Sequence, residues 1–429
     1  MKLLVIGSGG REHALAWCLA KTPGLQKVFV APGNAGTAAE RGLENVDITD
    51  LDALADFAEE EKVSLTIVGP EAPLAAGIVN LFRTRGLKIF GPSKEAAQLE
   101  SSKDFAKRFM TRHGIPTARF ASFSERASAH AYVDQQGAPI VIKTDGLAAG
   151  KGVVVAMTVD EAHAALDRML PAEGPRAPKG SRPGQVVIEE FLEGEEASFI
   201  VMVDGKDVLP LASSQDHKRI GDGDTGPNTG GMGAYSPALV VTPEVHAKAM
   251  REIILPTVRG MAAEGMPYTG FLYAGLMIGK DGSVKTVEFN CRLGDPEAQP
   301  ILMRLKSDLF TLLDHAVAGK LDQVEASWDR RVALGVVLAA ANYPSTPRTG
   351  DVISGLPKAS EDSEDSHVFH AGTSERDGQT VTAGGRVLCV TALGDNVKQT
   401  QKRAYNLIIG IHFDGMQYRH DIGHRAMPR

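Results

Sequence analysis

Two lysines flank a cluster of glycines in segment 140–153, which reads IVIKTDGLAAGKGV. An apolar run that predicts a strand carries Lys143, and a glycine-rich loop with Lys151 then leads into a second strand. Lysine ammonium groups neutralise phosphate oxygens, and glycine amides can close around them. A Walker A loop is excluded, because three residues rather than four separate Gly146 from Gly150. The segment therefore predicts a phosphate-binding hairpin, with a plain flexible hairpin as the alternative.

A second chemical signal lies in segment 284–295, which reads VKTVEFNCRLGD and predicts a strand. Side chains in a strand alternate between two faces, so its polar residues share one face: Glu288, Asn290 and Arg292. The residues between them are predicted to face the core: Val287, Phe289 and Cys291. Carboxylate and amide oxygens suit Mg²⁺, and an arginine fork suits a phosphate or a carboxylate. We predict a metal and phosphate site; the alternative is a solvated strand face with a salt bridge.

The first turn of the chain also has glycines where a phosphate could bind. Segment 5–13, VIGSGGREH, follows a predicted strand and opens a predicted helix, so Gly9 and Gly10 would let a phosphate approach the helix N-terminus. A dinucleotide fingerprint needs glycine or alanine at its sixth position, which is Glu12 here. The turn therefore disfavours NAD and leaves a substrate phosphate or a tight packing turn.

Two further segments are polar enough to line a ligand site. Segment 187–196, VIEEFLEGEE, predicts a strand followed by a bend and an acidic cluster. Backbone groups at the bend could bind the edge of an adenine, and a later carboxylate could bind the ribose hydroxyls. The alternative is a charged turn. Segment 214–232 begins SQDHKR, continues with many glycines and predicts a lid or substrate loop. Its His217 could act as a base, although a solvated loop histidine is the commoner case. The sequence has no HExxH or GxSxG pattern, so hydrolase chemistry lacks support.

The elements that must position these residues change character along the chain. Residues 1 to about 100 alternate strand and helix patterns, which predicts a parallel, doubly wound sheet. The expected strands are Lys2–Ile6, Lys27–Ala31, Leu65–Val68 and Lys88–Phe90, and the expected helices are Arg11–Ala20, Leu51–Glu60 and Ala75–Arg85. From about 103 to 325 strands dominate, which favours an antiparallel α+β region, and strand signals recur from about 328 onward.

This organisation predicts three domains. Their expected ranges are 1–102, 103–325 with a flexible lid lobe at about 122–192, and 326–429. Glycine and proline content predicts mobile loops at 171–184 and 221–233, and 360–366 is an acidic, solvated loop.

The composition excludes several classes of protein. The chain has 429 residues, of which 43% are apolar and 23% charged, as in globular proteins. A net charge of −7 argues against a nucleic-acid surface, and no apolar run approaches the ~18 residues of a membrane span. The apolar start is too short for a signal peptide. Three cysteines do not make a disulfide framework and fit a reducing compartment, so we expect a cytoplasmic protein.

Taken in order, these motifs resemble the ATP-grasp ligases, and among them the phosphoribosylamine–glycine ligase family. The resemblance runs through VIGSGGREHALAW, TIVGPEAPL, KIFGPSKEAAQLESSK, VIKTDGLAAGKGV, IEEFLEGEEASF, SQDHKRIGDGDTGPNTGGMGAYSP, VEFNCRLGDPE and DIGHRA, and covers essentially the whole chain. It implies an α/β and α+β multidomain fold: an N-terminal Rossmann-like domain, a two-lobed ATP-grasp core and a small C-terminal α+β domain. It also implies that ATP drives ligation of glycine to 5-phosphoribosylamine, through glycyl phosphate, in purine synthesis.

The resemblance further implies roles for single residues. The ATP-binding residues would be Lys103, Lys143, Gly150, Lys151, Glu189, Leu192 and Glu196. Glu288 and Asn290 would hold Mg²⁺, or alternatively Mn²⁺, while Arg292 and Lys151 would be catalytic. The substrate residues would be Gly9, Gly10, Arg11, Glu71, Asp216, Lys218 and Asp295. The expected partners are small-molecule substrates, with no nucleic acid and no membrane, and the expected state is a monomer.

The sequence departs from many ATP-grasp relatives at one metal ligand. Such relatives supply a further carboxylate near 274–278, where this chain reads AGLMI, so a second metal ion would rely on phosphates and water. Three rival interpretations remain at this point. They are an ATP-grasp ligase for another acid or amine, a nicotinamide dehydrogenase, and a non-catalytic nucleotide sensor.

Overall fold

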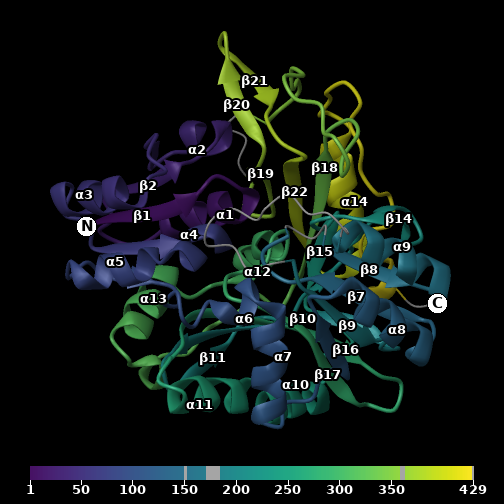
Figure 1. The fold of residues 1–429 in the computed structure, drawn as a ribbon. Coiled ribbons are helices and arrows are strands. Elements are labelled where there is room, and N and C mark those ends of the chain that lie inside the picture. Colours follow the sequence, from purple (N-terminus) through teal and green to yellow (C-terminus); the bar gives the residue numbers. More distant parts are fainter. Residues whose placement is uncertain (149–151, 171–183, 358–362, 428–429) are drawn as a thin grey trace.

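The structure of the protein, a computed structural model, describes residues 1–148, 152–170, 184–357 and 363–427. Figure 1 shows the N-terminal sheet beside the C-terminal sheet, with the central strands below both in that view. The predicted site residues Gly150 and Lys151 lie outside the described residues. So do nearly all of the predicted mobile loop at 171–184 and part of the acidic loop at 360–366.

The N-terminal sheet is parallel and doubly wound, as its alternating pattern predicts. Its strands are β1 (Lys2–Gly7), β2 (Lys27–Pro32), β3 (Leu43–Asn45), β4 (Leu65–Val68) and β5 (Ile89–Phe90), in the order β3-β2-β1-β4-β5. Leu3 and Val5 of β1 share a core with helix α1 (Gly10–Leu19). Leu4 and Ile6, on the opposite face, pack with helix α3 (Leu51–Glu60). Because successive side chains of a strand point to opposite faces, helices on both sides bury both faces of the sheet.

One predicted helix of this region is two helices. The range Ala75–Arg85 is covered by α4 (Glu71–Ala76) and α5 (Ile78–Thr84). Gly77 separates them with φ of 97°, a left-handed conformation that ends a helix and favours glycine. The short helix α2 (Ala35–Ala39) and strand β3 have too few residues to show a periodic pattern, and the sequence did not predict them.

The central segment contains two antiparallel sheets of four strands. The first has the order β11-β10-β16-β17 and is formed by β10 (Glu195–Asp204), β11 (Val208–Pro210), β16 (Thr269–Ile278) and β17 (Val284–Asn290). The second has the order β6-β9-β7-β8 and is formed by β6 (Phe120–Phe123), β7 (Ile140–Thr144), β8 (Val153–Ala156) and β9 (Val186–Glu190). The helices of the segment are α6 (Gln98–Ser101), α7 (Lys103–Arg112), α8 (Arg126–Gln136), α9 (Val159–Met169), α10 (Pro243–Ala249) and α11 (Leu255–Ala263). The predicted antiparallel character is confirmed.

The C-terminal sheet also takes in strands from the central segment. Its order is β12-β15-β18-β22-β19, formed by β12 (Gln215–Asp216), β15 (Gly233–Ser236), β18 (Val332–Ala339), β22 (Arg386–Gly394) and β19 (Ser366–His370). Two hairpins accompany it, β13 (Arg219–Gly221) with β14 (Thr225–Asn228), and β20 (Thr373–Arg376) with β21 (Gln379–Thr382). The remaining helices are α12 (Ala298–Arg304), α13 (Leu309–Val317) and α14 (Val397–Ile408). Because β12 and β15 extend this sheet, the loop before β13 is held between the central and C-terminal parts.

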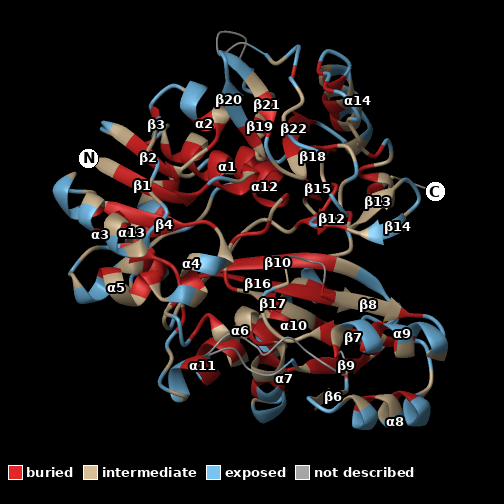
Figure 2. Cartoon of the chain, turned by 45° about the horizontal axis from the view of Figure 1, so that its top comes forward, coloured by how far each residue is buried: buried red, intermediate tan, exposed pale blue. Residues whose placement is uncertain are grey.

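Burial follows this arrangement. In Figure 2 the central strands β10 and β16 and the N-terminal strands are mostly buried, whereas α8 and α9 carry many exposed residues. Among the helices of the described residues, none is both long enough and apolar enough to cross a membrane.

Candidate active site

A cavity of about 790 Å³ lies where the N-terminal, central and C-terminal segments meet. The predicted site residues that line it are Arg11, Glu71, Lys103, Lys143, Glu189, Leu192, Glu196, Asp216, Lys218, Glu288, Asn290, Arg292 and Asp295. Gly9 and Gly10 are not among its lining residues. The fold thus brings motifs from almost the whole length of the chain to one cavity.

Helix α7 contributes two lysines to the cavity wall. The helix begins after Ser102, whose Oγ accepts a hydrogen bond from the backbone N–H of Phe105 at 3.2 Å. Lys103 donates from Nζ to the carbonyl of Gly146 at 2.8 Å and so ties α7 to the loop after β7. Lys107 lies one turn further along the same helix face and also lines the cavity. Lys107 was not predicted, although its spacing of four residues from Lys103 was a usable signal.

A buried carboxylate holds two of the cavity lysines. Glu189 on β9 is 4% exposed and forms ion pairs of 3.0 Å with Lys107 and Lys143. Burial lowers the pKa of Lys107 to about 8, and Glu189 opposes part of that shift. Lys143 also donates to the carbonyl of Val287 at 3.1 Å. The adenine-reading role of Glu189 rests on its backbone groups and stays a prediction.

A β-bulge changes which side chains of β17 face the cavity. Gly275 of β16 pairs with Glu288, but the next residue, Leu276, pairs with Thr286, so one extra residue stands on β17. The prediction that Val287 faces the core is therefore wrong: Val287 lines the cavity. Phe289 lies in the core as predicted. The bulge also turns the carbonyl of Val287 toward Lys143.

Glu288 is an ionised carboxylate among cations. Burial alone would raise its pKa, but four nearby cations lower it below its ordinary value. These cations are Lys218, Lys143, Lys103 and Arg292. Together with the amide oxygen of Asn290, Glu288 offers the hard oxygen donors that a divalent ion of the Mg²⁺ or Mn²⁺ type prefers. The residue opposite on β16 is Gly275, so this neighbour adds no further carboxylate.

Arg292 is held at the end of β17 by three oxygen-bearing groups. Its guanidinium forms ion pairs with Glu71 at 3.3 Å and Glu100 at 3.0 Å, and donates to Oδ1 of Asn290 at 3.2 Å. Burial works to lower the pKa of Arg292, but the charges of Glu100 and Glu71 raise it. The fixed fork therefore stays charged at the cavity wall. Glu100 was not predicted, and its burial on α6 gave no sequence signal.

The N-terminal turn is filled by its own carboxylate. Glu12 accepts hydrogen bonds from the backbone N–H of Gly9 at 2.7 Å and from Nε of Arg11 at 2.5 Å. A Cβ built on Gly7 would lie 2.4 Å from the Glu12 side chain, so carboxylate and glycines fit closely. Glu12 therefore occupies the place in which a dinucleotide phosphate would bind. Of the predicted residues in the turn, Arg11 reaches the cavity, while Gly10 packs against Gln299.

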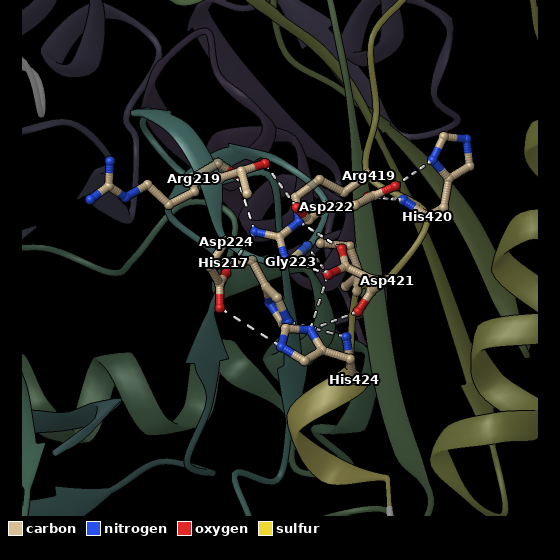
Figure 3. Close-up of polar contacts among 12 residues, drawn as sticks. His217, Arg219, Asp222, Gly223, Asp224, Arg419, His420, Asp421 and His424 are labelled. Atoms are coloured by element: carbon tan, nitrogen blue, oxygen red, sulfur yellow. Dashed lines mark hydrogen bonds and ion pairs between the residues drawn. The ribbon is translucent and has the colours of Figure 1, made fainter.

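The predicted mobile loop at 221–233 contains an ordered hairpin in this structure. Figure 3 shows the C-terminal segment holding β13 and β14 through a polar network. Arg419 is 0% exposed and pairs with Asp224 at 2.9 Å and with Asp421 at 2.7 Å. The expectation of a loose loop was wrong because its charged partners lie about 200 positions later in the chain, where local composition gives no sign of them.

Two further arginines line the cavity from the C-terminal segment. Arg425 donates to the backbone oxygen of Asp216 at 3.0 Å and pairs with Asp224 at 2.7 Å. Arg386 on β22 donates to the backbone oxygen of Asp295 at 2.7 Å. Neither arginine was predicted as a site residue. Lys218 is paired with Glu196, so the carboxylate predicted to hold a ribose is already bound to a cation.

His217 is neither a solvated loop residue nor a base in the cavity. Its side chain is 0% exposed, and Nε2 accepts a hydrogen bond from the backbone N–H of Gly423 at 3.2 Å. Burial, followed by the charges of Arg425 and Arg419, lowers its pKa to about 3. His217 is therefore a neutral structural residue that joins β12 to the C-terminal segment.

The buried neutral His217 should make stability depend on pH. Its pKa is lowered in the folded state and ordinary (about 6.5) in the unfolded state, so the unfolded state binds the extra proton first as pH falls. The free energy of unfolding should therefore drop between pH 6.5 and pH 5, with about 2 kcal/mol due to this residue. In His217→Gln that slope should shrink, as measured by urea unfolding at several pH values. The partly exposed His315→Gln should keep the full slope, and equal slopes in all three proteins would contradict the assignment.

A separate histidine cluster joins the N-terminal and C-terminal parts but is a poor metal centre. His13, Glu40 and His367 have ligand atoms within 4.8 Å of one another. Nδ1 of His13 accepts the backbone N–H of His370 at 2.8 Å, so the neutral ring carries its proton on Nε2. That proton is directed to Glu40 at 3.1 Å. The cluster is therefore best described as a hydrogen-bonded contact.

Family models match successive parts of the chain. They are described as the phosphoribosylglycinamide synthetase N domain (residues 1–100), ATP-grasp (A) domain (residues 101–298) and C domain (residues 333–425). A phosphoribosylamine–glycine ligase of Ralstonia nicotianae is 67% identical over 429 residues, which is 100% of both chains. This chain belongs to the phosphoribosylamine–glycine ligase family. The family member of Vibrio parahaemolyticus is 62% identical over 431 residues, covering 100% of this chain and 99% of that one.

Solved structures agree with this family assignment. The crystal structure of a phosphoribosylamine–glycine ligase from Thermotoga maritima has a TM-score of 0.84 and 36% identity, covering 99% of this chain and 100% of that one. The biotin carboxylase domain of a Hydrogenobacter thermophilus 2-oxoglutarate carboxylase, at 15% identity and a TM-score of 0.71, shares the fold. The predicted fold class and ATP-grasp membership are thus confirmed. As ATP-grasp ligases, members of the phosphoribosylamine–glycine ligase family use ATP and a divalent metal ion.

Proposed function

We propose that this chain joins glycine to 5-phosphoribosylamine at the expense of ATP, giving glycinamide ribonucleotide, ADP and phosphate. The observation that carries the proposal is the convergence of the lysines Lys103 and Lys143, the oxygen donors Glu288 and Asn290, and Arg292 on one cavity. Phosphoryl transfer needs charge of this kind around the transferred group. Family membership over the full length of the chain supports the choice of substrates.

The chemistry follows from the poor reactivity of a carboxylate toward an amine. A carboxylate oxygen of glycine attacks the γ-phosphorus of ATP, the bond to the leaving ADP oxygen breaks, and glycyl phosphate forms. The amine nitrogen then bonds to the acyl carbon, and the C–O bond to phosphate breaks with its electron pair on phosphate. No nucleophilic side chain is needed, so binding, orientation and charge stabilisation do the work.

The residues of the cavity divide this work between them. Lys103 and Lys143 neutralise ATP phosphate oxygens, and Arg292 stabilises the negative charge of the acyl phosphate. Glu288 and Asn290 would hold a divalent ion, which we propose to be Mg²⁺ and which neutralises phosphate charge when bound. The flap residues Gly150 and Lys151, the adenine contacts at Glu189 and Leu192, and the ribose contact at Glu196 are carried over as proposals from the sequence.

The part of the cavity beyond the proposed ATP and metal residues is proposed to bind glycine and the ribose phosphate. Arg11, Lys218 and Arg386 supply positive charge there, and Glu71, Asp216 and Asp295 supply carboxylates. Gly9 and Gly10 contribute by shaping the turn behind Arg11. We further propose that the enzyme works as a monomer in the cytoplasm on these small molecules alone.

Steady-state ADP release tests the proposal. With ATP and Mg²⁺ present, we expect rapid release only when glycine and freshly generated phosphoribosylamine are added together. Equally rapid release with glycine and another phosphorylated amine, or with another acid in place of glycine, would point to a different ligase on the same fold. No release with the expected pair would overturn the substrate assignment.

A further inference from the structure

The carboxylates that line the cavity differ in whether the protein engages them. Among the described residues of the wall, each carboxylate side chain has a hydrogen bond or an ion pair with the protein, except Asp216 and Glu288. Glu297, for example, accepts from the hydroxyls of Tyr273 at 2.8 Å and Ser198 at 3.0 Å. Glu288 is accounted for as a metal ligand. Asp216, which is proposed to border the substrates, is a free carboxylate with no chemical step assigned to it.

The surroundings of Asp216 fix its backbone but supply no hydrogen bond to its carboxylate. Asp216 ends β12, pairs with Ala234 of β15, and receives a hydrogen bond on its backbone oxygen from Arg425. Its Oδ1 is buried and has no hydrogen-bond partner. Gly231, with φ of 117°, lies so close that a Cβ there would be 2.7 Å from that oxygen. A buried unsatisfied oxygen is costly unless a ligand supplies the missing donor, which suggests that a donor arrives with the substrate.

The proposed reaction releases one proton, which must have an acceptor. The attacking amine nitrogen carries two hydrogens, and the amide product keeps one of them. When the N–C bond forms and the C–O bond to phosphate breaks, the other hydrogen must leave as a proton. We propose that Asp216 is the general base that accepts this proton through its carboxylate. The inference rests on the proposed function and adds a catalytic residue to it.

The charges around Asp216 suit a proton acceptor. Burial, followed by the charge of Glu297, raises the pKa of Asp216 well above its ordinary value, and Glu196 acts in the same direction. Lys218, two positions along the chain, and Arg386 of β22 oppose this shift. A carboxylate with a raised pKa takes up a proton more readily near neutral pH than an ordinary one. The adjacent His217 cannot substitute for it, because its accepting nitrogen is bound to Gly423.

Hydroxylamine separates the formation of glycyl phosphate from the attack by the amine, and it therefore tests whether Asp216 acts as the general base. In excess, this small nucleophile intercepts an acyl phosphate as a hydroxamate and can pass its own proton to solvent. With ATP, Mg²⁺, saturating glycine and hydroxylamine, Asp216→Asn should lose far less of its glycine hydroxamate rate than of its amide-forming rate. With phosphoribosylamine instead, its amide-forming rate should fall by about 10²–10⁴-fold, the usual range for loss of a general base. Asp222→Asn, in the turn between β13 and β14 and outside the cavity lining, should leave both rates unchanged.

The possible results are distinct. An equal loss of both rates in Asp216→Asn, or an unchanged amide rate, would overturn the base role. Absence of amide formation from phosphoribosylamine in the wild-type enzyme would overturn the proposed function itself, whereas absence of hydroxamate from the wild type would overturn the separation of half-reactions on which the base role is tested. As a second measurement that needs no variant, the amide-forming rate of the wild type should fall in acid along a limb that the hydroxamate rate lacks. Identical pH profiles for the two reactions would also overturn the inference.

Discussion

Replacing Glu288 by glutamine is expected to reduce ADP release by about 10³-fold or more, because the metal ion that it would hold is worth several kcal/mol of transition-state charge stabilisation. The side chain keeps its size, so circular dichroism should show an unchanged fold. The low pKa of Glu288, set by four surrounding cations against the effect of burial, means that the wild-type group is a full negative charge. The variant removes that charge.

A metal titration makes this test specific. Glu288→Gln should need a much higher metal concentration for its residual turnover, whereas Glu190→Gln should not. Glu190 also lies on the cavity wall, but its carboxylate is engaged by Arg119 and Lys285. Full turnover of Glu288→Gln at saturating Mg²⁺ would contradict its role as a ligand.

Arg292→Lys is the second substitution with a large expected effect. Lysine keeps the charge but loses the planar fork that contacts Glu71, Glu100 and Asn290. We expect kcat to fall by about 10²–10³-fold, the range seen when one donor to a developing oxyanion is removed. The KM for ATP should change little, because we propose that the lysines Lys103 and Lys143 carry most of the ATP contact.

A surface arginine provides the matched control. Arg331 pairs with Asp329 and Asp365 away from the cavity, so Arg331→Lys should leave kcat unchanged. A normal kcat in Arg292→Lys, with only a raised KM for ATP, would show that Arg292 binds substrate without stabilising the transition state.

Much of the fold could be predicted because its signals are local. Strand β4 and helix α3 begin and end where the sequence predicts. In each of these elements a pattern of apolar residues continues over several positions. At the start of α3, the side chain of the capping residue Asp50 also accepts a hydrogen bond from the backbone N–H of Ala53. The prediction of one helix over 75–85 was wrong because the helix breaks at Gly77, where the backbone is left-handed. A single glycine in the sequence is not enough to predict that conformation.

The candidate site was predicted less fully, because its finer geometry depends on contacts between distant segments. The strand alternation placed Glu288 and Asn290 on one face, but the bulge that exposes Val287 is a property of the pairing with β16. His217 was misjudged because its partner Gly423 lies 206 positions away. Arg386 reaches the cavity only because β22 joins the same sheet as β12, which no local pattern indicates.

In the proposed reaction, the cavity activates the carboxylate of glycine by phosphorylating it. The most direct test uses glycine labelled with ¹⁸O in its carboxylate, together with ATP and phosphoribosylamine, and mass analysis of the phosphate released. If glycyl phosphate forms, each phosphate should carry one ¹⁸O atom from glycine. Unlabelled phosphate at full amide yield would contradict the account, because the carboxylate oxygen would then have left by another route.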